Sequence, residues 1–164
     1  MLARSDGVGL IELVVVLAII AVLAASALSF NGWIDKYRAE SQVKQLYSDL
    51  MRAREQAVTG KRMYFIRMAN NTYNIFVDNA PAPDGDNALN APGFPDTRLK
   101  RVALSNQLTM ESDLAWIDID SEGLLSGATY IHLKSLTAPE LNCVVLAPTR
   151  ISLGSWDGAN CVPN

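Results

Sequence analysis

Cysteine and histidine are scarce in this chain of 164 residues, and their scarcity excludes most catalytic and metal-binding chemistry. The two cysteines, Cys143 and Cys161, both lie in the last 22 residues, and His132 is the single histidine. Two cysteines alone make a poor zinc site, and one histidine without a free thiol supplies no nucleophile–base pair. We therefore expect no enzyme, no bound metal and no cofactor, and we expect His132 to lie on a strand surface or to be satisfied locally.

Proline is absent before Pro81, and charge is absent from Leu13 to Ile34, a run of 22 residues. A helix of that length extends about 33 Å, enough to cross the hydrocarbon core of a bilayer. Glu12 stands at the start of the run, and an intramembrane carboxylate costs about 3 kcal/mol, so it should have a partner. One alternative is a secretory signal peptide, with Arg4 as its basic region and cleavage after Ala25-Ser26-Ala27. The other alternative is a retained membrane anchor.

Basic residues do not outnumber acidic residues in this chain. The chain carries 14 Lys and Arg against 17 Asp and Glu, a net charge of −3, which argues weakly against a dedicated nucleic-acid binder. Some basic residues could still gather into a patch, although a solvated face is the interpretation that we favour. These residues are Arg52, Arg54, Lys61, Arg62, Arg67, Arg98, Lys100 and Arg101.

A helical pattern continues beyond the uncharged run. Apolar residues recur at helical spacing and leave most of the charged residues on the other faces; they are Val43, Leu46, Tyr47, Leu50, Ala53 and Ala57. The pattern ends at Thr59-Gly60, with Gly60 as a C-cap candidate. We predict one long helix over residues 10–59, apolar in its first half and amphipathic in its second, which bends or loosens at Asn31-Gly32.

Short β-rich runs follow Gly60. Residues 69–71 predict a hairpin turn, and residues 79–97, with four of the seven prolines, predict an exposed loop. The pattern indicates an α+β fold in which the amphipathic half of the helix packs on an antiparallel β-sheet. The predicted strands are 62–68, 72–78, 98–105, 108–111, 115–119, 129–133, 143–146 and 150–153.

Two acidic motifs are candidate calcium sites. Asp118-x-Asp120-x-Glu122-Gly123 is similar to the start of an EF-hand loop, but its twelfth position is Thr129, where a bidentate glutamate is required. Asp84-Gly85-Asp86 is better interpreted as an acidic turn. The sequence therefore predicts no metal site.

The segment Gly7-Val8-Gly9-Leu10-Ile11-Glu12-Leu13 resembles the type IV prepilin signature, in which a short leader ends in glycine and an acid follows at the fifth mature position. The resemblance implies cleavage by a prepilin peptidase between Gly7 and Val8, and N-methylation of Val8. The freed amine of Val8 lies one helical turn from Glu12. In a filament, the amine of an incoming subunit can pair with Glu12 of its neighbour, which gives Glu12 a role in assembly.

A second resemblance covers the body of the chain. Ala53-Arg54-Glu55-Gln56-Ala57-Val58 is similar to the helix end of the GspH/FimT family of pseudopilins and minor pilins. Later family elements correspond to residues 121–123, 130–134 and 143–153. Some FimT-like members bind DNA through a Gly-Arg-x-Arg motif; the corresponding residues 148–152 keep only Arg150, so nucleic acid is an unlikely partner.

These resemblances imply a leader peptide at residues 1–7, a transmembrane and filament-core helix at 8–34, and a periplasmic pilin-like domain at 35–164. They imply a minor pilin that helps to initiate or cap a type IV pilus-like filament, with other pilin subunits, the prepilin peptidase and the inner membrane as partners. A minor pseudopilin of type II secretion is one alternative. A soluble periplasmic binding domain, released after Ala27, is the other.

The two cysteines suit a disulfide in an oxidising compartment. They are the only cysteines in the chain and lie 18 positions apart. Closing such a loop stabilises the folded state by roughly 3 kcal/mol on the chain-entropy model. We expect a Cys143–Cys161 bridge that fastens the C-terminal tail, with two reduced thiols as the alternative.

Overall fold

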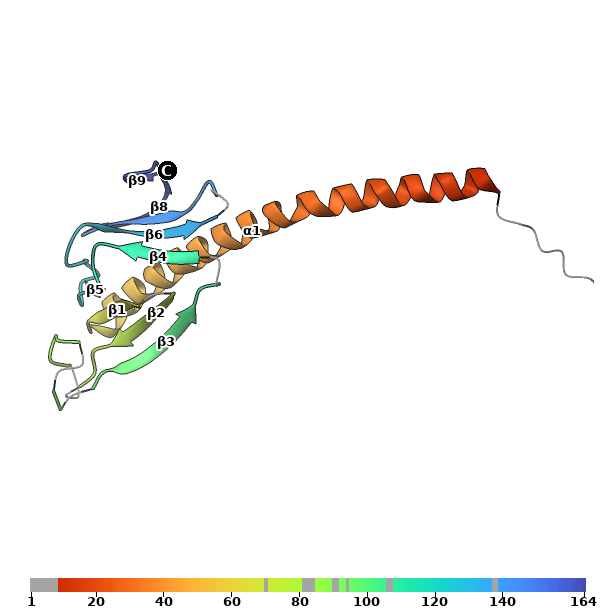
Figure 1. Ribbon diagram of the computed structural model, residues 1–164. Helices are drawn as coiled ribbons and strands as arrows, with labels where there is room; N and C mark the ends of the chain where they lie inside the picture. The colour runs from red at the N-terminus through yellow and green to blue at the C-terminus, as the bar shows by residue number, and fades with distance from the viewer. Residues whose placement is uncertain are drawn as a thin grey trace, which may run out of the picture. The chain divides into compact units, whose positions relative to one another are not determined.

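The computed structural model describes residues 9–69, 71–80, 85–89, 92–93, 95–105, 108–136 and 139–164, with the backbone alone at 25–31. The chain divides into two units, Met1–Asp35 and Lys36–Asn164. One helix, α1 (Leu10–Gly60), contributes to both (Figure 1). The helix observed matches the predicted one to within a residue, because residues 10–60 contain no proline and are rich in good helix formers. Its backbone remains helical through Asn31 and Gly32.

The C-terminal end of α1 closes differently from the prediction. The left-handed residue is Lys61, with φ of 52°, rather than Gly60. The Arg62 N–H donates to the Ala57 carbonyl at 3.3 Å, which is the six-to-one hydrogen bond of a Schellman motif. Gly60 is therefore the last helical residue, and the lysine after it reverses the chain into the first strand.

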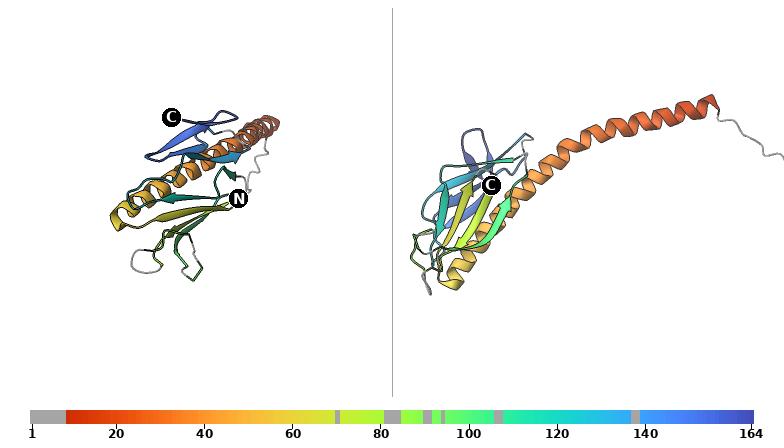
Figure 2. Two further views of the ribbon diagram at one scale, coloured as in Figure 1. Left: turned by 90° about the vertical axis from the view of Figure 1, so that its left-hand side faces the viewer. Right: turned by 60° about the horizontal axis from the view of Figure 1, so that its bottom comes forward.

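The strands divide between two antiparallel sheets, which confirms the α+β class (Figures 1 and 2). The four-stranded sheet has the order β3-β2-β1-β5 and the five-stranded sheet has the order β4-β6-β7-β8-β9. The short β9, in the Gly- and Asn-rich tail, was not predicted, and the other strand bounds differ from the prediction by one to three residues. The strands are β1 (Tyr64–Ala69), β2 (Thr72–Val77), β3 (Thr97–Ala103), β4 (Leu108–Ser112), β5 (Trp116–Ile119), β6 (Thr129–Ser135), β7 (Cys143–Ala147), β8 (Arg150–Trp156) and β9 (Cys161–Pro163).

A single apolar core joins the amphipathic half of α1 to both sheets. The predicted helix face is buried, apart from Tyr47, which packs against the core while remaining partly exposed. Burying such a stripe is the main source of stability for a helix of this kind. The buried residues of α1 are Ala39, Val43, Leu46, Leu50, Ala53 and Ala57.

Strand alternation gives the four-stranded sheet an inner and an outer face. Ile66, Ile75 and Ile117 are buried on the inner face, toward the core. Their chain neighbours point the other way. Arg67 pairs with Asn74 of β2 on one side and with Trp116 of β5 on the other, so these three side chains form one row across the outer face.

Candidate functional site

Glu12 lies in the first turn of α1, and its side chain is exposed. Its N–H donates to the Gly9 carbonyl at 2.9 Å, so the helix is already formed around it. A carboxylate in the first turn interacts favourably with the helix dipole. Gly7 and Val8 lie outside the described residues, so the cleavage site, the methylation site and the pairing of Glu12 with an amine stay predictions.

Apolar side chains are exposed along the first turns of α1. Leu10 is 84% and Ile11 is 77% exposed, and the large apolar side chains that follow, as far as Leu23, are each about half exposed or more. Exposed apolar patches of this extent mark interaction surfaces. In the part of the chain that the structure describes, no helix is long and apolar enough to cross a membrane.

The other half of α1 is tied to the edge of the four-stranded sheet by Asp49. This buried carboxylate accepts a hydrogen bond from the Tyr73 hydroxyl at 2.6 Å. Both of its oxygens lie 2.6 Å from Nζ of Lys100 on β3. Burial, and then Asp49, raise the pKa of Tyr73, so the phenol stays protonated and donates. The cluster therefore fixes the helix to its sheet.

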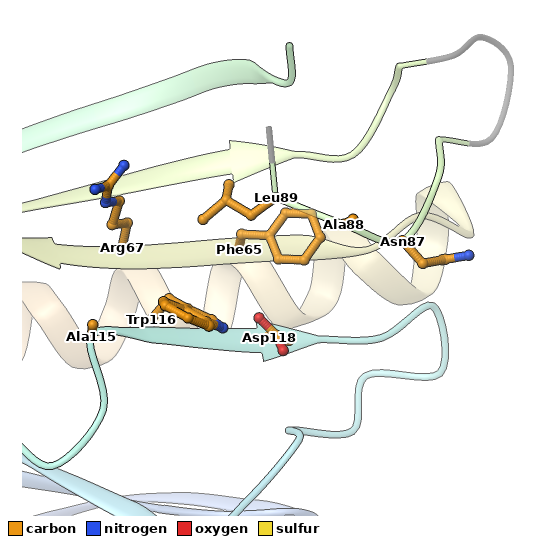
Figure 3. Close-up of a pocket in the computed structure, with 8 residues that line it drawn as sticks. All are labelled: Phe65, Arg67, Asn87, Ala88, Leu89, Ala115, Trp116 and Asp118. Atoms are coloured by element: carbon orange, nitrogen blue, oxygen red, sulfur yellow. The ribbon is translucent and has the colours of Figure 1, made fainter. Parts of the chain in front are cut away.

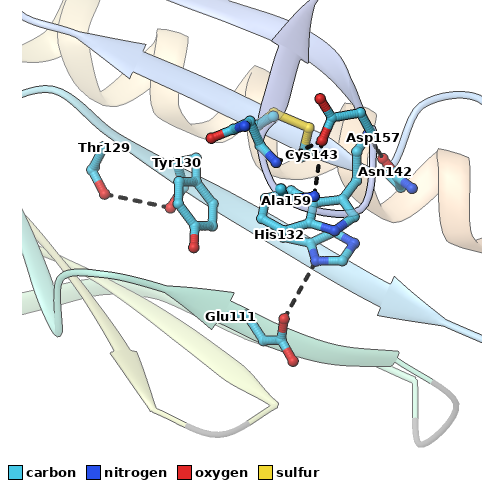
Figure 4. The surroundings of a disulfide bond; sticks show 11 residues. Glu111, Thr129, Tyr130, His132, Asn142, Cys143, Asp157 and Ala159 are labelled. Carbon is cyan, nitrogen blue, oxygen red and sulfur yellow. Dashed lines mark hydrogen bonds and ion pairs between the residues drawn. A yellow bond between two sulfur atoms is a disulfide. The ribbon is translucent and has the colours of Figure 1, made fainter.

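The C-terminal strands are fastened by the Cys143–Cys161 disulfide, as expected from the sequence (Figure 4). The bridge joins β7 to β9, with a Cα–Cα separation of 6.0 Å. Both strands pair with β8, and the bridge passes beside Gly154. A Cβ atom at Gly154 would lie 2.5 Å from the Val162 carbonyl oxygen and 3.0 Å from Sγ of Cys161. Glycine is required there because the backbone of β9 comes so close.

His132 lies beside this bridge and is buried, which corrects the surface alternative (Figure 4). Its ring stacks on Trp156, with centroids 4.4 Å apart and an interplanar angle of 8°. Its Nδ1 lies 3.4 Å from Oε2 of Glu111. Burial lowers the pKa of His132, and Glu111 partly opposes that shift. The neutral imidazole therefore acts as a core aromatic.

The first acidic motif, at residues 118–123, forms a turn. Oδ1 of Asp120 accepts the N–H groups of Glu122 and Leu124, each at 2.8 Å, and so closes its own loop. Asp84 of the second motif lies outside the described residues. Among the residues that are described, no three His, Cys, Asp or Glu side chains converge as metal ligands.

The basic residues of the candidate patch lie on several elements, namely α1, β1, β3 and the α1–β1 connection. Lys100 is occupied by Asp49, whereas Arg67 and Arg101 lie in one row on the outer sheet face, separated by Asn74. Arg150 is exposed at the start of β8, after the Pro148-Thr149 turn.

One structural feature was missed by the sequence reasoning. Asp78, at the end of β2, is fully buried and accepts the N–H groups of Asp86 at 3.1 Å and Asn87 at 2.6 Å. Burial raises its pKa, and these two hydrogen bonds oppose the shift. Gly85 has φ of 88°, and a Cβ there would lie 1.9 Å from Oδ1 of Asp78. The β2–β3 loop is thus held to the sheet, although its composition predicted only an exposed loop.

Comparison with known proteins supports the interpretation of both units. Residues 2–28 match the prokaryotic N-terminal methylation motif. The structure is similar to the minor pseudopilin EpsH of the type 2 secretion system of Vibrio cholerae, with a TM-score of 0.55 and 12% identity over 75% of this chain and 99% of that one. It is also similar to the type IV minor pilin FimU of Pseudomonas aeruginosa, with a TM-score of 0.54 and 14% identity over 79% of this chain and 96% of that one. Curated protein sequences give no significant match.

The chain thus joins a prokaryotic N-terminal methylation motif to a helix and two antiparallel sheets whose fold is similar to that of a minor pilin and a minor pseudopilin. The similarity to EpsH and FimU agrees with the resemblance of the sequence to the GspH/FimT family. At 12% and 14% identity, these similarities establish the fold and do not identify the filament to which the chain belongs.

Proposed function

We propose that this protein is a minor pilin, a structural subunit that helps to initiate or cap a type IV pilus-like filament. The observation that carries the proposal is the methylation motif at residues 2–28, joined to a helix that has Glu12 in its first turn and exposes apolar side chains from Leu10 to Leu23. Such a helix needs an apolar environment. The inner membrane supplies it before assembly, with residues 35–164 in the periplasm, and neighbouring helices supply it in the filament.

Glu12 gives this packing its register. Cleavage after Gly7 frees the amine of Val8, and an amine and a carboxylate attract strongly where water is excluded. An incoming subunit whose amine meets Glu12 of its neighbour removes the cost of an unpaired acid in an apolar environment. Docking is therefore favoured at one axial position. Other pilin subunits and the prepilin peptidase are the partners that this function requires.

A minor pseudopilin of type II secretion is the second candidate. The similarity to EpsH is as close as the similarity to FimU, which supports it to the same degree. Deletion of the gene in its host separates the two functions. A minor pilin deletion lowers surface piliation, whereas a pseudopilin deletion blocks secretion of exoproteins and leaves pili in place.

The test of processing is the intact mass of the protein from its native host. Loss of residues 1–7 with a methyl group on Val8 is the expected result. A large residue in place of Gly7 should leave the full-length precursor in the membrane. An N-terminus at Leu28 would instead identify a secreted domain released by signal peptidase and would contradict the proposal that the N-terminal helix is retained as a membrane anchor.

A further inference from the structure

A cavity of about 580 Å³ opens on the outer face of the four-stranded sheet, on the side turned away from α1 (Figure 3). Its volume lies in the range of roughly 300–1,000 Å³ that is typical of small-ligand sites. Three segments line it, β1, β5 and the β2–β3 loop, through Phe65, Arg67, Trp116, Asp118, Asn87 and Leu89. None of these side chains takes part in the assembly function proposed above.

The apolar part of the cavity consists of aromatic rings beside the loop. Phe65 is buried, whereas Trp116, in the neighbouring strand β5, is 55% exposed, and its indole is seen nearly edge-on beside the Phe65 ring in Figure 3. A single exposed tryptophan is common on protein surfaces. Here the indole lines a cavity together with apolar side chains and one charged side chain of each sign, and an aromatic ring in that setting is suited to stacking against the apolar face of a ring.

The charged part of the cavity is balanced. Arg67 is directly opposite Trp116 and Asp118 is directly opposite Phe65, so the cation and the anion lie diagonally across the β1–β5 pair. No ion pair engages Arg67 or Asp118 among the described residues. A site with one charge of each sign favours a ligand that is neutral overall.

Asp118 has unused hydrogen-bonding capacity. Its Oδ1 is buried and has no hydrogen-bond partner among the described residues. Burial raises the pKa of Asp118, and a hydrogen bond from Ser126 opposes that shift. An unpaired buried acceptor is costly, so a donor from a ligand is favoured here. Arg67 has only N–H donors and therefore calls for an acceptor.

The backbone at the C-terminal end of β5 is already paired, which shortens the edge that an added peptide strand could use. The Ala115 carbonyl accepts the Met68 N–H at 2.9 Å, and the Asp118 carbonyl accepts the Ser126 N–H at 3.2 Å. Ile119 forms a bridge with Leu125. Strand addition needs free main-chain groups along an edge. Side chains are therefore the main source of recognition in this cavity.

We propose that this cavity binds an acetamido sugar, with the pyranose ring stacked on Trp116. The acetamido group has a donor and an acceptor that match these side chains. Its N–H donates to Asp118, and its carbonyl accepts from Arg67. Its methyl group packs toward Phe65 and Leu89. The ligand is neutral, carries both donors and acceptors, and has an apolar ring face.

The loop side of the site is held in place before any ligand binds. Asp78 accepts the N–H of Asn87, and Gly85 fits against the same carboxylate. Asn87 itself has φ of 62°, a left-handed conformation that asparagine tolerates better than most residues. Preorganisation of this kind reduces the entropy lost on binding.

The test uses the full chain in a detergent without a sugar head group, titrated with chitotriose and, as the matched probe, cellotriose. Tryptophan fluorescence and the indole N–H resonances report binding, and the chain has three tryptophans. Chitotriose should perturb the Trp116 signal, and cellotriose, which lacks the acetamido groups, should bind at least tenfold more weakly. Trp116→Phe should abolish the perturbation, and Trp33→Phe should retain it.

Asp118→Asn tests the donor contact, because it keeps the shape of the side chain and removes the charge. It should weaken chitotriose binding about tenfold or more at an unchanged melting temperature. The proposal is overturned if chitotriose leaves the Trp116 signal unmoved, if both trisaccharides bind equally, or if only a peptide from a neighbouring subunit occupies the cavity. These outcomes leave filament assembly untouched, so they do not test the minor pilin function.

Two sources could supply the sugar, namely cell-wall glycan strands and other acetylated polysaccharides. The disaccharide of N-acetylglucosamine and N-acetylmuramic acid separates them in the same titration, with the lactyl carboxyl group amidated so that the probe is neutral. Tighter binding than chitobiose identifies the cell-wall strand. Weaker binding identifies a polysaccharide without the lactyl group.

Discussion

At the scale of single residues, His132 shows opposing influences on one titratable group. Burial lowers its pKa, which favours the neutral ring stacked on Trp156. Glu111, with Oε2 3.4 Å away, favours the charged ring, and Lys134, 3.6 Å from the other Glu111 oxygen, counteracts Glu111. Burial dominates, so the folded chain resists protonation at this position.

A pH dependence of stability follows. An unfolded histidine titrates near 6.5, and the folded pKa is lower. Between those two values the unfolded state binds more protons, so the free energy of unfolding falls as the pH is lowered below about 6.5. His132→Phe keeps the stacked ring and removes the titration. Thermal unfolding from about pH 5 to about pH 8 should show a weaker pH dependence for the variant, and parallel profiles would contradict this assignment.

At the scale of elements, β9 depends on the disulfide. This strand has three residues, and its connection to β8 is a Gly- and Asn-rich turn. Short terminal strands fray unless they are fastened. Cys143 and Cys161 provide that fastening, and Gly154 leaves room for it.

Removing the bridge should therefore loosen one end of one sheet. Cys143→Ser with Cys161→Ser should lower the free energy of unfolding by about 3 kcal/mol. Hydrogen exchange should rise in β8 and β9 first, while amides of β1 and β2 serve as the internal control. Two free thiols found by labelling the denatured, unreduced protein from the native host would refute the bridge.

The β2–β3 loop offers a second test with a matched control. Gly85 and Gly93 both have positive φ, at 88° and 89°. A Cβ atom added at Gly85 would clash with Oδ1 of Asp78, whereas a Cβ atom added at Gly93 would lie in open space. Gly93→Ala should cost about 1 kcal/mol of backbone strain. Gly85→Ala adds a steric clash and separates Asp78 from the N–H groups of the loop, so its cost should be larger by about 1–3 kcal/mol. Thermal unfolding of the two variants measures the difference, and equal losses would remove the role of Asp78 as the loop anchor.

At the scale of the whole molecule, the same helix serves two environments. Its second half buries an apolar stripe within the chain, and its first turns expose apolar side chains and Glu12. The second half is satisfied by the two sheets. The first half requires an apolar environment from outside the chain, and the proposed filament would provide one.

Glu12→Val should leave membrane insertion and cleavage largely intact and reduce incorporation into filaments severalfold, because the amine of the next subunit loses its partner. Sheared filaments from the host, probed for this subunit, measure the effect. Glu55→Gln is the matched control, since Glu55 is an exposed acid of the same helix outside the apolar run. Normal incorporation of the Glu12→Val protein would remove the pairing argument.

The sequence alone determined the parts of this protein that depend on local pattern. The lack of proline and the 3.6-residue period gave the helix over residues 10–60 and its buried stripe from Val43 to Ala57. Alternation and turn residues gave eight of the nine strands that the structure describes. Having only two cysteines gave the disulfide pairing without ambiguity.

Only the tertiary structure decided which strands share a sheet and which side chains meet. Asp49 reaches Lys100 across 51 positions, Asp78 holds a proline-rich loop, and Arg67 comes to lie opposite Trp116. Each of these contacts depends on strand order and register. Register is set by the burial of one face of every strand at once, which is a property of the packed core. Local propensity does not contain it.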